Sequence, residues 1–525
     1  MNSPVQWSSG WRERIWEDLD REWDVVIVGG GITGAAILGA AVQRGWSALL
    51  VEQRDFAWGA SSRSSKLVHG GLRYLKEGKL GLTRASARER KLLLDEYPDL
   101  ISPLGFSLAT YEGVHPSPWQ YRLGLSVYDL LAGQWDHERY SPSQMRLIVP
   151  NLQQEGLNGG FRFGEAVTDD ARLTLELIRR AAAEGASAIN YVRAEELTRK
   201  AGRVTGLALR DTESDRVTSV RAGFVINATG AWVDRLREQV GGAPRIRPLR
   251  GSHLVLPQWR LPLPQAVSKP HPWDGRPVFA LPWEGATIVG TTDEDHEPSL
   301  SVEPRITPGE TAYLMAFLHD LFPSLAIGHE DVLSTFAGVR PVIATGEIDP
   351  SKESRDHVVW EENGLVTVTG GKLTTFRLIA RDALRKIEDA AEGQSFVTRM
   401  REKGLRSRKR GMAKWRGTVA DTVVGTARDG ELEPIAGTSR LWAELRWAAK
   451  NEGVVHLEDL LLRRVRLGLL LEGGGAEILP RVKDICAEEL GWDDARWETE
   501  EAAYLETWNR SYRPPTPEDV APIPQ

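Results

Sequence analysis

The stretch Asp24-Val-Val-Ile-Val-Gly-Gly-Gly-Ile-Thr-Gly34 decides the fold of this chain. Residues 25–28 form a short apolar run that is followed by glycine, which is typical of a strand buried on both faces of a sheet. Glycines at positions 29, 31 and 34 then allow a tight turn. Residues 35–45 have the small side chains and the closing glycine of a helix. The stretch therefore predicts a strand, a glycine turn and a helix in direct succession.

A second strand with an acidic end completes this unit. Residues 47–52 are apolar and end at Glu52, which stands 23 residues after Gly29. Dinucleotide-binding units place at this distance the carboxylate that binds a ribose hydroxyl pair, and their glycine turn lets a pyrophosphate approach the helix N-terminus. The contacts expected in this unit are Gly29, Gly30, Gly31, Ile32, Thr33, Gly34 and Glu52.

Two later segments bring the chain back to the same ligand. Residues 224–232 predict a buried strand that ends in Ala-Thr-Gly, and residues 365–377 predict a strand, a Gly-Gly turn and the start of a helix. Glycine-marked contacts that extend from residue 24 to residue 377 suit the long FAD molecule better than NAD. Further strands are expected at 188–193, 204–210 and 216–221. The FAD contacts expected from these segments are Val192, Thr229, Gly230, Gly371, Leu373 and Thr374.

The polar stretch Ser61-Ser-Arg-Ser-Ser-Lys-Leu-Val-His-Gly-Gly-Leu-Arg-Tyr-Leu75 follows the second predicted strand. It contains four serines, three cations and one histidine, so little of it belongs in a core. A solvated surface loop is the plain alternative, but we interpret the stretch as a loop along a phosphorylated ligand. Its Gly-Gly pair turns the chain so that Arg73 and Tyr74 face a substrate. The cofactor contacts expected here are Ser61, Ser62, Lys66, Leu67 and His69.

Composition excludes several classes of protein. The net charge of −7 gives no overall positive field for nucleic acid, so no nucleic-acid partner is expected. The single cysteine, Cys486, excludes an internal disulfide framework and a cysteine-based metal cluster, and no metal site is expected. The sequence contains no apolar run of about 18 residues and its start does not resemble a secretory signal. We therefore expect a cytoplasmic protein.

Eight motifs now resemble a known family in their order along the chain: GGGITG, SSRSSKLVHGGLRYL, INATGAW, GSHLVLP, VGTTD, GVRP, SRDH and TGGKLTTFR. The chain resembles the FAD-dependent glycerol-3-phosphate dehydrogenases from about residue 24 to residue 377, and more loosely at 457–467 and 490–492. The resemblance implies an α/β fold. It consists of an FAD-binding doubly wound (glutathione-reductase-like) domain, an interleaved α+β substrate lobe and a C-terminal all-α domain.

The resemblance also implies an activity, namely oxidation of sn-glycerol 3-phosphate to dihydroxyacetone phosphate with electrons passed to a membrane quinone. Such a reaction needs a hydride acceptor, a base for the hydroxyl proton and cations for the phosphate. A plain ion pair with Asp356 is the alternative for Arg355, and a core position is the alternative for His253. The expected substrate-binding residues are Arg73, Tyr74, His253, Arg340, Arg355 and Lys372, with His253, Arg340 and Lys372 as catalytic residues.

The expected domain organisation follows the motifs. An N-terminal leader helix occupies residues 1–22, the oxidoreductase domain residues 23–398, a basic linker residues 399–417, a helical domain residues 418–512 and a Pro-rich tail residues 513–525. Within the oxidoreductase domain, cofactor elements are expected at about 23–90, 161–250 and 333–398. The substrate lobe is expected at about 91–160 and 251–332.

Three questions stay open in the sequence. The acceptor is the first, because an oxidase that uses oxygen and makes peroxide has the same fold. A flavoprotein subunit without activity is a further alternative, against which His253, Arg340 and Lys372 argue.

The second question is which segment contacts the anionic membrane surface. Peripheral contact on the inner face of the cell membrane is expected from the linker 399–416 or from an aromatic-flanked helix at 119–135. The alternative for that helix is a place in the core of the lobe. The third is the oligomeric state, a homodimer included.

Overall fold

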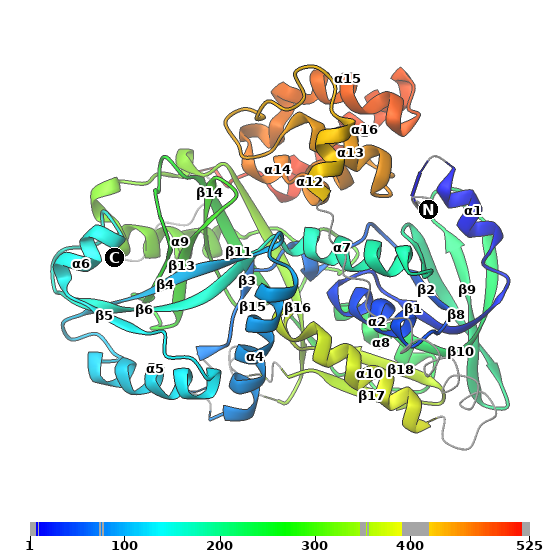
Figure 1. Cartoon of the computed structure of the whole chain (residues 1–525), viewed down its shortest axis with the longest axis horizontal. Coiled ribbons are helices and arrows are strands. Elements are labelled where there is room, and N and C mark those ends of the chain that lie inside the picture. Colours follow the sequence, from blue (N-terminus) through cyan, green and yellow to red (C-terminus); the bar gives the residue numbers. More distant parts are fainter. Residues whose placement is uncertain are drawn as a thin grey trace.

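Two β-sheets lie side by side in the computed structural model of this chain, and a helical domain lies above the line where they meet (Figure 1). The structure describes residues 7, 8, 10–72, 75, 78–346, 353, 356–390 and 419–516. The predicted fold class is confirmed: a doubly wound domain is interleaved with an α+β lobe and followed by an all-α domain.

The first sheet is built around the strand that the glycine-rich stretch predicted. Strand β1 (Glu22–Val28) pairs in parallel with β10 on one edge and β2 on the other, so Val25, Val26 and Ile27 are fully buried. The strand order is β17-β18-β10-β1-β2-β7, and the hairpin β8–β9 extends it from β10. The other strands are β2 (Ala48–Val51), β7 (Ser187–Ile189), β8 (Val192–Lys200), β9 (Arg203–Asp211), β10 (Val217–Asn227), β17 (Val358–Glu362) and β18 (Leu365–Thr369).

Three helices share one hydrophobic core with this sheet. Helix α2 (Ile32–Gln43) packs between α7 (Asp170–Ala183) and α10 (Phe376–Ala390). The small side chains of α2, such as Ala35 and Ala41, are fully buried, because they let the helix approach its neighbours closely. Shorter elements are α1 (Trp11–Glu17), η1 (Ala60–Ser62), η2 (Gly230–Trp232), α8 (Val233–Glu238) and η6 (Leu373–Thr375).

The second sheet is almost entirely antiparallel and forms the other lobe. Its order is β15-β11-β14-β13-β12-β4-β6-β3, with β16 paired to β11 and β5 paired to β6. Its strands are β3 (Leu67–Val68), β4 (Ile101–Tyr111), β5 (Glu138–Tyr140), β6 (Leu157–Thr168), β11 (Ile246–Pro257), β12 (Ala266–Pro270), β13 (Pro277–Trp283), β14 (Ala286–Gly290), β15 (Glu294–Asp295) and β16 (Ser334–Ile343). Its helices are α4 (Leu80–Glu96), α5 (Pro118–Ala132), α6 (Pro142–Ile148), α9 (Pro308–Leu321), η3 (Pro323–Leu325) and η4 (His329–Asp331).

The two lobes exchange strands at positions that differ from the expected boundaries. The segments 161–250 and 333–398 were both expected to supply cofactor elements only. Instead, most of β6 and all of β16, with which these segments begin, belong to the second sheet. The cause is that strand partners are set by contacts distant in sequence, which local patterns do not reveal.

The longer elements of the C-terminal domain are all helices, as expected. They are α12 (Val419–Thr426), α13 (Trp442–Asn451), the π-helix η8 (Asp459–Arg464), α14 (Leu467–Leu470), η9 (Glu472–Ile478), α15 (Leu479–Leu490) and α16 (Asp494–Ser511). Its buried side chains share one core with the second sheet, in which Leu457 and Trp497 join Phe336 and Trp283. The domain is therefore packed onto the oxidoreductase body and not tethered beside it.

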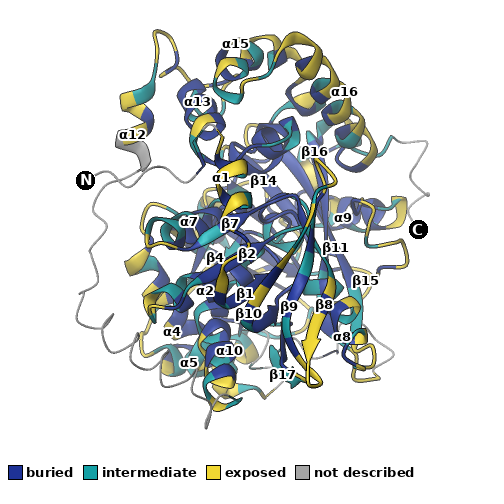
Figure 2. Ribbon diagram, turned by 90° about the vertical axis from the view of Figure 1, so that its right-hand side faces the viewer, coloured by how far each residue is buried: buried dark blue, intermediate teal, exposed yellow. Residues whose placement is uncertain are grey.

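Burial follows this arrangement. Figure 2 shows buried strands at the centre and exposed positions along α15, α16 and the tips of the outer hairpins. Among the described residues, no helix is both long enough and apolar enough to cross a membrane. The expected linker 399–417 and the tail from residue 517 onward lie outside the described residues.

Candidate active site

One continuous cavity of about 1990 Å³ runs between the two sheets. Its walls include the carboxyl ends of β1, β10 and β18 and the loop that follows β2. In doubly wound folds the ligand binds at the carboxyl ends of the parallel strands, so the cavity lies where the topology predicts it.

The glycine turn after β1 needs its glycines for close approach. Gly29 has a φ of +114°, and a Cβ atom there would lie 2.5 Å from the carbonyl oxygen of Ala228. A Cβ atom on Gly34 would lie 1.9 Å from the carbonyl oxygen of Gly29. The first turn of α2, with Gly31, Ile32 and Thr33, lines the cavity and directs the positive end of the helix dipole into it. This cradle fits the pyrophosphate of FAD.

Glu52 ends β2 at the cavity wall. Its carboxylate accepts hydrogen bonds from the backbone N–H groups of Gly30 (2.7 Å) and Arg54 (2.9 Å), and burial raises the pKa of Glu52. The acid thus joins the glycine turn to the second strand and borders the cavity where a ribose is expected. Val192, expected as a further cofactor contact, is fully buried, and its neighbours Arg193 and Ala194 line the cavity in its place.

The loop after β2 lies along the cavity, but two of its expected contacts are corrected. Ser61 accepts a hydrogen bond from the N–H of Ile32 (2.9 Å) and lines the cavity, as do Leu67 and His69. Ser62 and Lys66 are buried away from it. The ammonium of Lys66 donates to Asp170 (2.8 Å) and to the carbonyl of Ser62 (2.7 Å). Lys66 is therefore a structural cation, and burial lowers its pKa to about 8.

His253 stands on β11 at the cavity wall and is almost completely buried. Its Nε2 atom lies 2.9 Å from Oγ of Ser65, and its ring stacks on Phe336 at 4.5 Å between ring centres. Burial, with the cations Arg340 and Lys66 nearby, holds the pKa of His253 well below its usual value. Its Nδ1 atom has no hydrogen-bond partner among the described residues. The side chain is a neutral imidazole that is able to accept a proton.

Arg340, on β16, lies beside the same part of the cavity. Its guanidinium donates to Asp293 (2.9 Å) and to Thr291 Oγ1 (2.8 Å), and both partners line the cavity with it. The guanidinium lies over Gly251, where a Cβ atom would come within 2.0 Å of Nη2. Gly290 gives His253 similar room, since a Cβ atom there would lie 2.2 Å from its Cδ2. Two glycines thus hold open the places of two expected catalytic side chains.

The Gly-Gly turn after β18 forms the third wall. Lys372 is half-buried at the start of η6, its Nζ atom lies 3.4 Å from Oγ of Ser86, and it lines the cavity. Thr374 accepts a hydrogen bond from the N–H of His69 (3.0 Å), which ties this turn to the loop after β2. The other expected residues that line the cavity here are Thr229, Gly230, Gly371 and Leu373. Arg73, Tyr74 and Arg355 lie outside the described residues.

Several cavity residues were not expected from the sequence. Arg276 stands in the turn between β12 and β13 and lines the cavity near Asp293, whose carbonyl lies 3.4 Å from its Nη1 atom. Like Arg340 it stands directly before a proline and close behind a glycine, so the sequence contained a signal for it. Ser64 and Ser65 also line the cavity, within the very stretch that the motif marked.

Helix α5 borders an apolar arm of the cavity, and several of its side chains are exposed, two of the cavity-lining ones included. Trp119, Tyr121, Leu123 and Val127 line the arm together with side chains of α4, β4 and β6. Exposure is 67% for Trp119, 59% for Leu123, 77% for Leu130 and 71% for Trp135. The alternative that this helix belongs to the lobe core is therefore wrong for these four positions.

Two family models match the chain. Residues 24–381 match the model described as FAD dependent oxidoreductase, and residues 406–497 match the C-terminal domain of alpha-glycerophosphate oxidase. The chain is also 40% identical over 379 residues to the aerobic glycerol-3-phosphate dehydrogenase of Staphylococcus aureus (strain USA300). That alignment covers 71% of this chain and 68% of the relative.

Two solved structures have folds similar to that of this chain. The glycerol-3-phosphate dehydrogenase from Bacillus halodurans, complexed with FAD, matches with a TM-score of 0.74 and 29% identity, over 95% of this chain and 98% of that chain. The L-alpha-glycerophosphate oxidase from Mycoplasma pneumoniae, with FAD bound, shares the fold with a TM-score of 0.57 and 20% identity, over 70% of this chain and 94% of that chain. The family model covers more than half of the chain, and the curated relative is matched over two thirds of its length. This chain therefore belongs to the FAD-dependent oxidoreductase family and, within it, to the FAD-dependent glycerol-3-phosphate dehydrogenases.

Proposed function

We propose that this protein oxidises sn-glycerol 3-phosphate to dihydroxyacetone phosphate and passes the electrons to a membrane quinone. The proposed oxidation rests mainly on one observation. A neutral imidazole, His253, and a fixed guanidinium, Arg340, line the same cavity. A secondary alcohol that bears a phosphate needs both of these groups within a few ångströms of each other.

FAD, when bound, supplies the two-electron acceptor for the hydride that leaves the carbinol carbon. The chain's own residues have the remaining tasks. His253 accepts the hydroxyl proton at the imidazole, because burial and the neighbouring cations keep that ring neutral at physiological pH. Arg340 binds the phosphate with its planar fork, which Asp293 and Thr291 hold in place. Lys372, at the Gly-Gly turn after β18, adds a second positive charge to the cavity wall.

A single anaerobic experiment tests this activity. Glycerol 3-phosphate should bleach the visible absorbance of the purified yellow protein within seconds, and glycerol at the same concentration should leave it unchanged. Equal bleaching by glycerol would contradict the role of the cations, and no bleaching by glycerol 3-phosphate would contradict the proposed function as a whole.

The quinone is supported by the apolar arm of the cavity along α5. An arm lined by Trp119, Tyr121 and Leu123, continuous with the cofactor site, suits an apolar aromatic acceptor better than it suits a phosphate. The oxidase that uses oxygen is the second candidate, which the matched C-terminal family model and the similar Mycoplasma pneumoniae structure favour. Turnover with a short-chain quinone that greatly exceeds peroxide formation in air would decide for the quinone.

A lipid-soluble acceptor requires contact with the bilayer. The exposed side of α5, with Trp119, Leu123 and Leu130, and Trp135 just after the helix support peripheral contact with an anionic membrane on its cytoplasmic face. In this arrangement the apolar arm opens at the surface that meets the lipid. A homodimer stays a prediction and is not needed for this arrangement.

A further inference from the structure

The loop from residue 53 to residue 67 packs against the glycine turn that forms the cofactor cradle, and its backbone is strained at two positions. Ala57 and Lys66 have φ values of 62° and 61°, in the left-handed region that side chains other than glycine rarely adopt. Such conformations persist only where surrounding contacts impose them. The loop nevertheless makes the contacts on which the cradle depends: Ala57 donates to the carbonyl of Gly30 (3.0 Å), and Ser61 accepts from Ile32.

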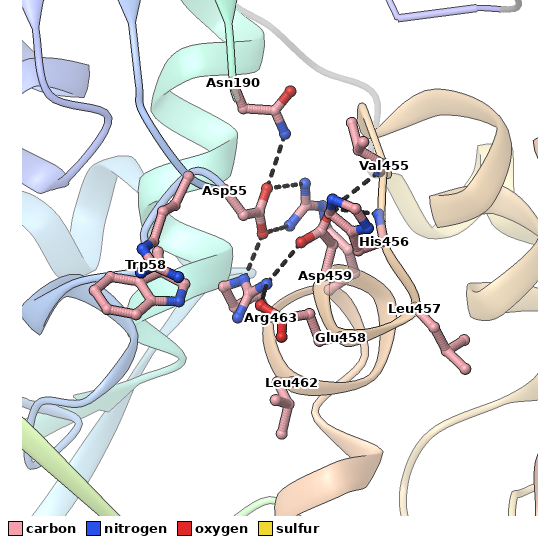
Figure 3. Close-up of polar contacts among 12 residues, drawn as sticks. Asp55, Trp58, Asn190, Val455, His456, Leu457, Glu458, Asp459, Leu462 and Arg463 are labelled. Carbon is pink, nitrogen blue, oxygen red and sulfur yellow. Dashed lines mark hydrogen bonds and ion pairs between the residues drawn. The ribbon is translucent and has the colours of Figure 1, made fainter. Parts of the chain in front are cut away.

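Several of the contacts that hold this shape come from the C-terminal domain, beside others from the oxidoreductase domain itself. Asp55, fully buried at the start of the loop, accepts two hydrogen bonds from Arg464, at 2.5 and 2.7 Å, and one from Arg463. Asn190 completes the set at 3.0 Å. Figure 3 shows Asp55 reaching across from the oxidoreductase domain to Arg463, with Asn190 above Asp55 and Asp459, which also accepts from Arg463, to its right.

Three further contacts join the same domains beside the later part of the loop. Arg466 donates to the carbonyl of Ser62 (2.9 Å) and to Asp170 (2.6 Å), and Asp170 also accepts from Lys66 and from both polar groups of Ser64. Arg63 donates to the hydroxyl of Tyr512 (3.0 Å). The loop is thus held at Asp55 and at Ser62–Arg63 by side chains that lie more than 390 residues further along the chain.

The side chains in this cluster are ionised at neutral pH. Burial alone would raise the pKa of Asp55, but the guanidinium groups of Arg464 and Arg463 lower it to about 2. Arg463, Arg464 and Arg466 are each 1% exposed. Arg463 and Arg464 close the single π-helical segment among the described residues, η8, and wide turns of this kind occur mostly at functional positions.

We propose that Arg463, Arg464 and Arg466 are positioning residues for FAD: the C-terminal domain holds the loop 53–67 in the strained shape that keeps the cofactor in its cradle. They act through Asp55, Ser62 and Asp170 and line no part of the cavity themselves. The C-terminal domain therefore supports the cofactor site from behind the loop, and none of its described residues lines the cavity.

The test is the rate at which the holoenzyme releases FAD on dilution, followed by the rise in flavin fluorescence. Arg464→Met should release FAD at least tenfold faster than the parent protein. Arg172→Met is the matched control, because Arg172 joins the same two domains through Glu452 (2.5 Å) and does not contact the loop. The control should stay within threefold of the parent, even where its melting temperature falls as far as that of Arg464→Met.

A second variant is needed because Arg464→Met could fail to fold. It leaves the buried Asp55 carboxylate with one cation fewer. The double variant Asp55→Asn/Arg464→Gln removes both charges together. It should fold, bind FAD with the ordinary absorbance spectrum and still release it at least tenfold faster. Release at the parental rate from either variant, or equally fast release from Arg172→Met, would overturn the proposal and reduce the cluster to a domain interface.

Discussion

The Nε2 atom of His253 lies 2.9 Å from the Oγ atom of Ser65, so the second sheet meets the cofactor loop at the expected base. His253 belongs to β11, whereas Ser65 stands in the loop that also binds the first turn of α2 through Ser61. The position of the imidazole therefore depends on the same loop as the cofactor cradle. We therefore expect proton transfer and cofactor binding to depend on each other through this polar contact.

Replacement of His253 by Asn should lower the rate of anaerobic flavin reduction by roughly a hundredfold or more, the usual worth of a positioned base. Because the pKa of His253 is held well below its usual value, the parental rate should stay level from pH 9 down to pH 7 and decline only in more acidic buffer. Stopped-flow absorbance measures both effects. His329→Asn, which changes a histidine outside the cavity, should behave as the parent does. An unchanged rate for His253→Asn would assign the proton to another group.

Replacement of Arg340 by Lys should lower kcat/KM for glycerol 3-phosphate by about ten- to hundredfold, since a charge-assisted contact contributes roughly 1.5–3 kcal/mol. The charge remains, so Asp293 keeps a partner, but the planar fork is lost. FAD content should not change. The matched control is Arg260→Lys, which alters an Arg–Asp pair with Asp331 on the lobe surface. Steady-state kinetics with a soluble dye decide, and equal losses in both variants would contradict a substrate role.

Glu52→Gln should weaken FAD binding by roughly tenfold. The amide keeps the size of the side chain, but its single oxygen accepts from only one of the N–H groups of Gly30 and Arg54, and its NH2 group leaves the other without an acceptor. Titration of the flavin-depleted full-length protein with FAD gives the dissociation constant. An unchanged constant would place the ribose contact elsewhere along the cavity.

The sequence predicted the cradle well and the loop beside it poorly, for a physical reason. A glycine turn is a backbone requirement, so the positions of Gly29 and Gly34 follow from spacing alone. The direction of a side chain in an irregular loop depends on partners far away. Lys66 turned inward because Asp170 lies there, more than a hundred residues later, and Arg464 was not connected with Asp55 by any local pattern. For the same reason β16 was placed in the wrong lobe.

His456 should make stability depend on pH in the alkaline range. It lies between Glu213 of the first lobe and Glu500 of α16, at 3.2 and 2.9 Å, and these partners outweigh burial and raise its pKa to about 10. Since the folded value exceeds the unfolded value of about 6.5, its stabilisation is complete below pH 6.5. It is lost as pH rises toward 10. The melting temperature of the parent should therefore fall more between pH 7 and pH 10 than that of His456→Gln; parallel curves would contradict the charge.

The exposed side of α5 and the turn that follows it should bind anionic vesicles. Leu130 and Trp135 are exposed and do not line the cavity, so Leu130→Gln/Trp135→Gln tests the membrane without disturbing the acceptor arm. Loss of two apolar side chains from the lipid should weaken co-sedimentation by roughly tenfold or more, at about 25 cal/mol per Å².

Turnover of this double variant with a soluble dye should stay unchanged, while turnover with a quinone embedded in vesicles should fall. The control is Leu147→Gln/Trp259→Gln, which removes equally exposed side chains, 82% and 79%, from other parts of the same lobe. Salt separates the two proposed anchors, because an apolar contact survives 1 M salt whereas an electrostatic contact through the linker 399–416 is screened. Full release by salt, with equal binding of both double variants, would move the membrane contact from α5 to the linker.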